Sequence, residues 1–360
     1  MRHTAHAGWS GARAARIAAA VVAGILLFPF ATAAQSGISL TGIPRYQPQA
    51  HVSGVIRVWG HGAWGRDFMA DLVNRWESDF SKYQPGIRFE NHLLGTATAM
   101  GALYTGTGDI AILGREVRPS ELDAFERVMG HRPVGVDVVA GSFNVPNKDF
   151  ALGIFVNRAN PLRGLTMKQL AEVFGCAQAG QRPLRTWGDL GLTGGWAARP
   201  IHVYGYQIRR GFGVYFDQMV LGGSGRWNCH YKELMKTRDS SGAMRDDGQV
   251  IVDTVAADPD AIAFSGMAYT NPGARTVALA RRDPGPFVPP TAETVFARSY
   301  PLFRVLTSFV DRRPNAPLDL KLREFLRFVL SREGQQDVLD TGGYLPLNPE
   351  VVRRERGKLQ

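Results

Sequence analysis

One stretch of the sequence carries the residue types of an anion-binding loop, GTATAMGALYTGTGDIAILGR at 95–115. A loop of small residues that opens a helix leaves backbone N–H groups free to bind an anion. Thr96 and Thr98 are placed to cap that helix or to donate hydroxyl groups to a ligand. Two glycines then end the helix, and 109–113 is a short apolar run typical of a buried parallel strand. We interpret the stretch as half of an α/β ligand-binding module.

Two further glycine-containing loops precede helices, at 60–65 and 205–213. If two lobes face each other, all three helix N-termini point into one cleft and suit a small oxyanion. GHGAWG at 60–65 also matches the dinucleotide-binding pattern between a strand and a helix. Glu90, which could bind the ribose, lies 30 residues past Gly60, further than usual. An anion loop is therefore the preferred interpretation, and an exported oxidoreductase is an alternative.

The sequence offers no set of catalytic residues. It contains no G-x-S-x-G elbow, no H-E-x-x-H, no Walker loop and no paired carboxylates in a glycine-rich setting, and its eight histidines are dispersed. We therefore expect a binding protein and not an enzyme, with no cofactor and no metal.

The first residues have the features of a signal peptide. Arg2, Arg13 and Arg16 form a positive segment without acidic residues, and 17–34 is apolar and ends in ATAA. We expect export by the Sec pathway to the periplasm with cleavage after Ala34. An uncleaved membrane anchor is the alternative, because the apolar run approaches the roughly 20 residues needed to span a bilayer.

The charge balance favours anionic partners. The chain has 42 Lys and Arg against 32 Asp and Glu, and loss of residues 1–34 lowers the first count to 39. No long basic run or aromatic-basic motif indicates nucleic-acid binding. Cys176 and Cys229 are the two cysteines, and in an oxidising compartment we expect them to form one disulfide.

Hydrophobic periodicity predicts strands that alternate with helices, typical of parallel or mixed sheets. Residues 35–50 show no periodicity and are expected to be a flexible leader. Thr166 with Gln169 forms a capping box at a helix start. The expected strands are 55–59, 87–91, 109–113, 134–143, 151–156, 201–204, 261–264 and 300–306.

Over residues 52–350 the chain resembles the PstS-like substrate-binding proteins of phosphate ABC transporters. The resemblance rests, in order, on DIAILGREV, FVNRANPLRGLTMKQLAEVFG, TWGDLG, IHVYGY, AIAFSG, YPLFRVL and GGYLPL. It implies an α/β fold of the type II periplasmic-binding-protein kind, with two mixed sheets flanked by helices and ligand between two lobes. Residues 151–156 and 300–306 would be the two crossing hinge strands.

The resemblance also implies a domain plan and a function. The expected function is capture of phosphate or a related oxyanion by a periplasmic monomer that presents it to an inner-membrane ABC permease. The expected segments are a signal peptide at 1–34, a leader at 35–51, lobe 1 at 52–150 and 300–350, lobe 2 at 151–299, and a tail at 351–360.

The ligand residues of the family match this chain only in part. Gly95-Thr96 keeps a hydroxyl and Gly114-Arg115 keeps an arginine, but the first loop has His61 and Ala63. The third loop, 204–212, replaces the family's Arg, Ser and Thr. A paralogue that has lost phosphate binding and has a structural or regulatory role, or binds an organic ligand, is therefore an alternative. The expected ligand residues are Gly62, Ala63, Thr96, Ala97, Thr98, Arg115, Arg210, Gly211 and Phe212.

Overall fold

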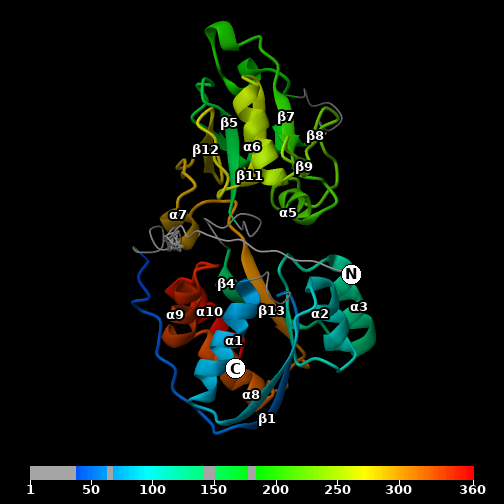
Figure 1. The fold of residues 1–360 in the computed structure, drawn as a ribbon, viewed down its shortest axis with the longest axis vertical. Coiled ribbons are helices and arrows are strands. Elements are labelled where there is room, and N and C mark those ends of the chain that lie inside the picture. The colour runs from blue at the N-terminus through cyan, green and yellow to red at the C-terminus, as the bar shows by residue number, and fades with distance from the viewer. Residues whose placement is uncertain (1–37, 63–67, 142–150, 177–183) are drawn as a thin grey trace, which may run out of the picture. The chain divides into compact units, whose positions relative to one another are not determined.

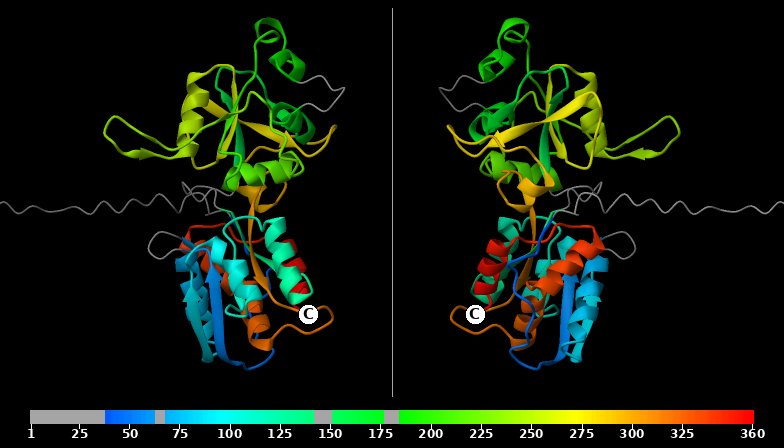
Figure 2. Two further views of the ribbon diagram at one scale, coloured as in Figure 1. Left: turned by 90° about the vertical axis from the view of Figure 1, so that its right-hand side faces the viewer. Right: turned by 90° about the vertical axis from the view of Figure 1, so that its left-hand side faces the viewer.

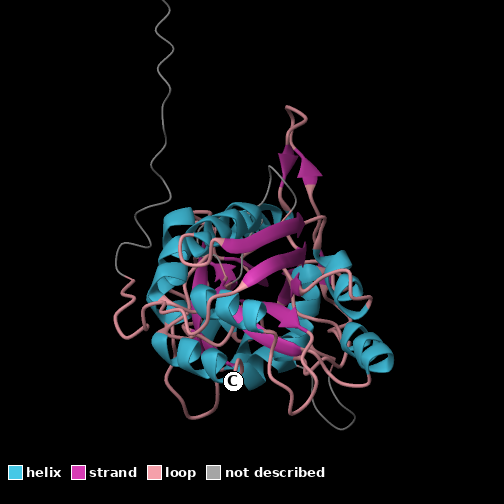
Figure 3. Cartoon of the chain, turned by 90° about the horizontal axis from the view of Figure 1, so that it is seen from below, coloured by secondary structure: helices cyan, strands magenta, loops and turns pink. Residues whose placement is uncertain are grey.

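The computed structural model describes residues 38–62, 68–141, 151–176 and 184–360. Most of its strands form two mixed sheets flanked by helices (Figures 1 and 3), as expected for the predicted α/β class. No helix within those ranges has both the length and the apolar character that crossing a bilayer requires. The predicted signal peptide at 1–34 lies outside the described residues.

The first sheet contains five strands in the order β2-β1-β3-β13-β4. β1 runs parallel to β2 and β3, whereas β13 is antiparallel to both β3 and β4. β13 comes from the C-terminal part of the chain, so this sheet is completed only after the second sheet has been traversed. The strands are β1 (Ser53–Gly60), β2 (Gly86–His92), β3 (Ile110–Ile112), β4 (Val134–Ala140) and β13 (Val305–Val310).

Helices cover both faces of the first sheet, and β3 shows why. Ile110 and Ile112 lie in the core on one face, while Ala111 and Leu113 lie in the core on the other, as the two-residue period of a strand requires. The first face packs on α1 (Phe68–Ser81), α8 (Leu320–Val329), α9 (Arg332–Thr341) and α10 (Pro349–Gly357), and the second on α2 (Thr96–Tyr104) and α3 (Pro119–Met129).

Two of the expected terminal segments are ordered parts of the first sheet's core. Ile43 and Tyr46 are buried, and the Tyr46 hydroxyl donates to Glu324 Oε2 at 2.8 Å, so the flexible leader was a wrong prediction for 38–50. The segment expected as a C-terminal tail, 351–360, contains most of α10, and its Leu359 is 2% exposed. In the first of these segments single apolar residues fill gaps between helices, which leaves no periodic pattern in the sequence.

The second sheet has six strands in the order β6-β12-β5-β11-β7-β8, and β5 is antiparallel to both of its neighbours. A two-stranded hairpin, β9 with β10, projects from the strands and helices around it in Figure 2. The elements are β5 (Leu152–Asn157), β6 (Gly164–Thr166), α4 (Met167–Phe174), β7 (His202–Gly205), α5 (Gly211–Val220), β8 (Lys232–Glu233), β9 (Thr237–Arg238), β10 (Met244–Arg245), α6 (Asp247–Ala257), β11 (Ala261–Gly266), β12 (Ala274–Ala280) and α7 (Ala292–Phe296). Short 3-10 helices cover Trp187–Leu190 and Gly194–Trp196.

Two local predictions illustrate how sequence determines these elements. The capping box at α4 is confirmed, since Thr166 Oγ1 accepts from Gln169 N–H at 3.1 Å and Gln169 Oε1 accepts from Thr166 N–H at 2.9 Å. The strand expected at 300–306 begins only at Val305, after a turn that contains Pro301. The expected limits of the two lobes stay a prediction.

The predicted disulfide is absent, because Cys176 and Cys229 are both free and exposed. Gly175 pairs with Trp227 in an antiparallel bridge, and Cys176 N–H donates to Arg226 O at 2.9 Å. This register puts Cys176 opposite Arg226 and not opposite Cys229, so the two thiols are not cross-strand partners.

Candidate functional site

Three loops meet at the carboxyl ends of β1, β2 and β3 in the first sheet. Gly95, which follows β2, donates its N–H to Gly60 O at the end of β1 at 2.8 Å. Gly114, which follows β3, donates its N–H to Thr96 Oγ1 at 3.1 Å. One backbone–backbone hydrogen bond and one hydrogen bond to the Thr96 hydroxyl therefore hold the three loops together.

Glycine is required where these loops approach most closely. Gly60 has φ +130°, and a Cβ there would lie 2.1 Å from Ile112 O. A Cβ on Gly114 would lie 2.4 Å from the ring of His61. The small residues that indicated a ligand loop in the sequence thus also allow the loops to pack against each other.

The N-terminus of α2 supplies backbone donors at this point. Thr96 and Ala97 are its first two residues, and Gly95 at the N-cap provides no side-chain acceptor for their N–H groups. The Thr98 hydroxyl instead donates to Gly95 O at 2.9 Å. Of the expected hydroxyl groups, Thr96 Oγ1 therefore orders the Gly114 loop and Thr98 Oγ1 stabilises the first turn of the helix.

Arg115 is held by an ion pair. Its guanidinium donates to both carboxylate oxygens of Glu121, at 2.8 and 2.6 Å, and to Glu116 O at 2.9 Å. Burial alone would raise the pKa of Glu121, but the hydrogen bonds from Arg115 and from Arg118 N–H outweigh it and lower the pKa. An anion at this place would share the guanidinium with Glu121.

The expected residues of the first loop are only partly described. Gly62 is buried with φ +127°, and a Cβ there would lie 3.1 Å from Ala70 N on α1. Ala63 lies outside the described residues.

The third loop leads into α5 and is built from aromatic side chains. Gly211 and Phe212 are the first two residues of α5, and the Phe212 ring lies 4.8 Å from the Tyr206 ring, centroid to centroid. Tyr206 is buried, and its hydroxyl accepts from Gly266 N–H at 3.2 Å. Arg210, at the N-cap, is exposed and pairs with no acidic residue in the described ranges.

A buried arginine that the sequence analysis did not select joins the two groups of loops. Arg304 is 3% exposed, and its Nε and Nη2 donate to the two oxygens of Glu116, each at 2.8 Å. Its guanidinium carbon lies 5.1 Å from the Phe212 ring centroid and 4.9 Å from that of Tyr215. Glu116 follows Arg115 directly, so Arg304 connects the first-sheet loops with the start of α5. The available signal was a lone arginine in the otherwise apolar run YPLFRVL.

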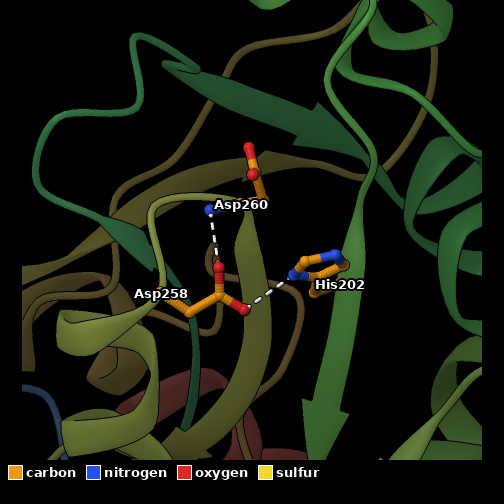
Figure 4. A group of neighbouring side chains, drawn as sticks. All are labelled: His202, Asp258 and Asp260. Atoms are coloured by element: carbon orange, nitrogen blue, oxygen red, sulfur yellow. Dashed lines mark hydrogen bonds and ion pairs between the residues drawn. The ribbon is translucent and has the colours of Figure 1, made fainter.

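A second group of polar side chains lies in the second sheet, where His202, Asp258 and Asp260 gather (Figure 4). His202 Nδ1 lies 2.8 Å from Asp258 Oδ2, and Asp260 N–H donates to Asp258 Oδ1 at 3.0 Å. Asp260 pairs with Arg199 at 2.6 Å. With a cation already on Asp260 and donors on both oxygens of Asp258, this arrangement acts as a hydrogen-bonded brace between β7 and the turn before β11.

Comparisons with known proteins agree with this architecture. Residues 63–333 match the PBP superfamily domain. The chain is 32% identical over 314 residues to the phosphate-binding protein PstS of Pseudomonas aeruginosa, covering 87% of this chain and 89% of that protein. It is 25% identical over 272 residues to protein SphX of Synechococcus elongatus, with 75% and 72% covered. The crystal structure of PstS from Borrelia burgdorferi has the same fold, with a TM-score of 0.54, 14% identity and coverage of 82% and 100%.

Proposed function

Because the chain belongs to the PBP superfamily and within it to the PstS phosphate-binding proteins, we propose that it binds phosphate or a related small oxyanion. It would act in the periplasm as a monomer and present the anion to an inner-membrane ABC permease. The family assignment argues against the alternative of an exported oxidoreductase.

The observation that carries this proposal is the junction of the three first-sheet loops. Thr96 Oγ1 fixes Gly114, and the first N–H groups of α2 lie beside that contact. Fixed N–H donors at a helix start favour a negative charge, and donors that are already positioned bind an oxyanion without a further ordering cost. The proposed ligand residues are Gly62, Ala63, Thr96, Ala97, Thr98, Arg115, Arg210, Gly211 and Phe212, with Arg304 and Glu116 as positioning residues.

Titration calorimetry of the chain from residue 35 onward with phosphate and with sulfate tests the proposal. We expect phosphate to bind at micromolar concentration and Arg115→Ala to weaken binding at least tenfold, equivalent to about 1.4 kcal/mol. Arg127→Ala, which removes an exposed arginine in the last turn of α3, is the matched control and should change nothing. Absence of phosphate binding in the unmodified chain would refute the function, whereas an unchanged Arg115→Ala variant would remove only that residue from the site.

The third loop favours a second candidate function. Tyr206 and Phe212 occupy the region where the family places Arg, Ser and Thr, and Arg304 stacks on Phe212. A paralogue that no longer transports phosphate, and that binds an organic ligand or an envelope partner, would be consistent with this replacement. Thermal unfolding with phosphate, sulfate, phosphonates and phosphate esters separates the two. A shift with an ester or phosphonate alone would favour the organic ligand, and no shift would favour the partner.

A further inference from the structure

A second concentration of positive charge lies on the helices that follow β13, and it shares no residue with the candidate site. A partly open cavity of about 290 Å³ lies between α8, α10 and the segment that contains Gln49 (α8 and α10 in Figure 1). We call it the arginine cavity; its lining residues are Gln49, Arg323, Arg327, Arg356, Leu359 and Gln360.

The three arginines converge for reasons of helix geometry. Arg323 and Arg327 lie four residues apart on α8, so their side chains share one face of that helix. Arg356 comes from α10, and its Nη1 donates to Arg327 O at 3.2 Å and to Leu330 O at 3.3 Å. The last carbonyl groups of α8 therefore hold the third guanidinium beside the other two.

These arginines have few acceptors within the protein. Arg323 makes no side-chain hydrogen bond or ion pair with the described residues, and its buried Nε has no partner. Arg327 Nη2 donates to Gln47 O at 3.3 Å, while its buried Nε has no hydrogen-bond partner. Buried N–H groups without acceptors are unfavourable, and an arginine cannot relieve this by losing its proton.

The carboxylate of Glu324, which lies beside Arg327, is largely occupied elsewhere. Glu324 Oε2 accepts from the Tyr46 hydroxyl at 2.8 Å and from Gln49 N–H at 3.2 Å, and Glu324 Oε1 lies 3.5 Å from Arg327 Nε. Burial, and then the charge of Arg327, lower the pKa of Arg356, and the charge of Glu324 opposes this lowering only in part.

We propose that the arginine cavity is an anion-binding site for a phosphate group carried by a small molecule. Guanidinium groups match phosphate oxygens through paired N–H donors, and the buried Nε groups of Arg323 and Arg327 need such acceptors. Small-molecule sites begin at about 300 Å³, so the volume suits a compact anion and not a bulky organic ligand. Phosphate groups of this kind occur on free anions and on lipid headgroups, and the experiment separates these sources.

Calorimetric titration with inorganic pyrophosphate at low ionic strength tests the proposal. We expect Arg323→Gln to weaken pyrophosphate binding at least tenfold, without loss of folding, because Arg323 makes no polar contact that its removal would break. Arg353→Gln is the matched control, since it removes the same charge from an exposed position on α10 outside the cavity. Arg353→Gln should change pyrophosphate binding less than twofold, whereas a loss in Arg115→Ala marks any pyrophosphate that binds at the candidate site instead.

Sedimentation with phosphatidic acid vesicles forms the second arm. Vesicle binding that Arg323→Gln abolishes and Arg353→Gln retains would identify the phosphate source as a headgroup. Pyrophosphate binding with the same dependence would identify it as a free anion. Three outcomes would overturn the proposal. Binding could fall equally in the Arg323→Gln and Arg353→Gln variants, it could fall only in Arg115→Ala, or the unmodified chain could bind neither pyrophosphate nor vesicles.

Discussion

The loops of the first sheet and the third loop of the second sheet begin helices in similar places but are built differently. In the first sheet, small residues interlock through backbone hydrogen bonds, as between Gly95 and Gly60. In the second, Tyr231 donates its hydroxyl to Tyr206 O at 2.5 Å, and aromatic rings fill the space around it. The first region therefore keeps positioned N–H donors, whereas in the second region packed aromatic rings stand in place of polar donor side chains. Most of the anion-binding free energy is therefore expected from the first region.

Arg304 connects the two regions, because its side chain contacts residues of both. It pairs with Glu116 on the first-sheet side and lies over the ring of Phe212 on the second. A cation with a carboxylate partner and two aromatic faces is stably held, so changes in either region reach the other through this side chain.

The largest effect should follow from breaking the first region's close approach. Gly60→Ala puts a Cβ 2.1 Å from Ile112 O at a φ of +130°, and we expect the free energy of unfolding to fall by about 3 kcal/mol. Urea unfolding followed by circular dichroism measures it. Gly101→Ala within α2 is the control, where the nearest atom is 3.7 Å away and alanine should stabilise the helix by up to about 1 kcal/mol. Equal stability in the two variants would contradict the interlocking.

A smaller effect is expected from separating the two regions. Glu116→Gln leaves the buried Arg304 guanidinium without its carboxylate and should lower the free energy of unfolding by about 2 kcal/mol. A double-mutant cycle with Arg304→Gln should give a coupling of at least about 1 kcal/mol.

Glu126→Gln provides the comparison for that cycle. Glu126 pairs with Arg132 at 2.6 Å, but both side chains are about half exposed, so we expect a change below about 0.5 kcal/mol. If Glu116→Gln lowered the free energy of unfolding no more than Glu126→Gln does, the ion pair between Glu116 and Arg304 would not contribute to stability.

The smallest effect is a difference in pH response between the two sheets. Burial raises the pKa of Glu77 on α1 to about 7, with partial opposition from the Asn91 hydrogen bond. The folded state thus favours neutral Glu77, and its contribution to stability is complete below about pH 4.5 and lost as pH rises to 7. Glu77→Gln should therefore gain about 1 to 2 kcal/mol over the unmodified chain between pH 5 and pH 8, measured by urea unfolding.

Asp258 in the second sheet should respond in the opposite direction. Burial opposes its ionisation, but the hydrogen bonds from His202, Asp260 N–H and Tyr204 lower its pKa. Its contribution is present above its ordinary pKa and is lost as pH falls through the lowered value. A destabilising effect of Asp258→Asn that grew on acidification would show that the brace does not depend on the charged carboxylate.

The sequence predicted the parts of the molecule that depend on local patterns. The capping box of Thr166, the glycine loop before α2 and the mixed sheets follow from spacing and residue type. The buried segment around Tyr46 and the free thiol of Cys176 depend on tertiary partners that no local pattern contains.

The same limit applied to the candidate site. Thr96 was selected for its hydroxyl, but only the fold shows that this oxygen accepts from Gly114 N–H. Arg304 was missed because its partner, Glu116, is almost 200 residues away in the chain. Charged residues inside apolar runs are therefore the sequence feature most worth examining for such connections.

The position of β13 has a consequence for how the chain folds. Ser308 pairs with Ile112 although about 200 residues separate them, and β13 lies between β3 and β4. Until residues 305–310 emerge, β4 has no strand beside it and the edge of β3 is uncovered. The second sheet closes from residues between 152 and 280, so it can form first, and the first sheet is completed by the last strand to be synthesised. The half that supplies the proposed N–H donors is thus assembled last.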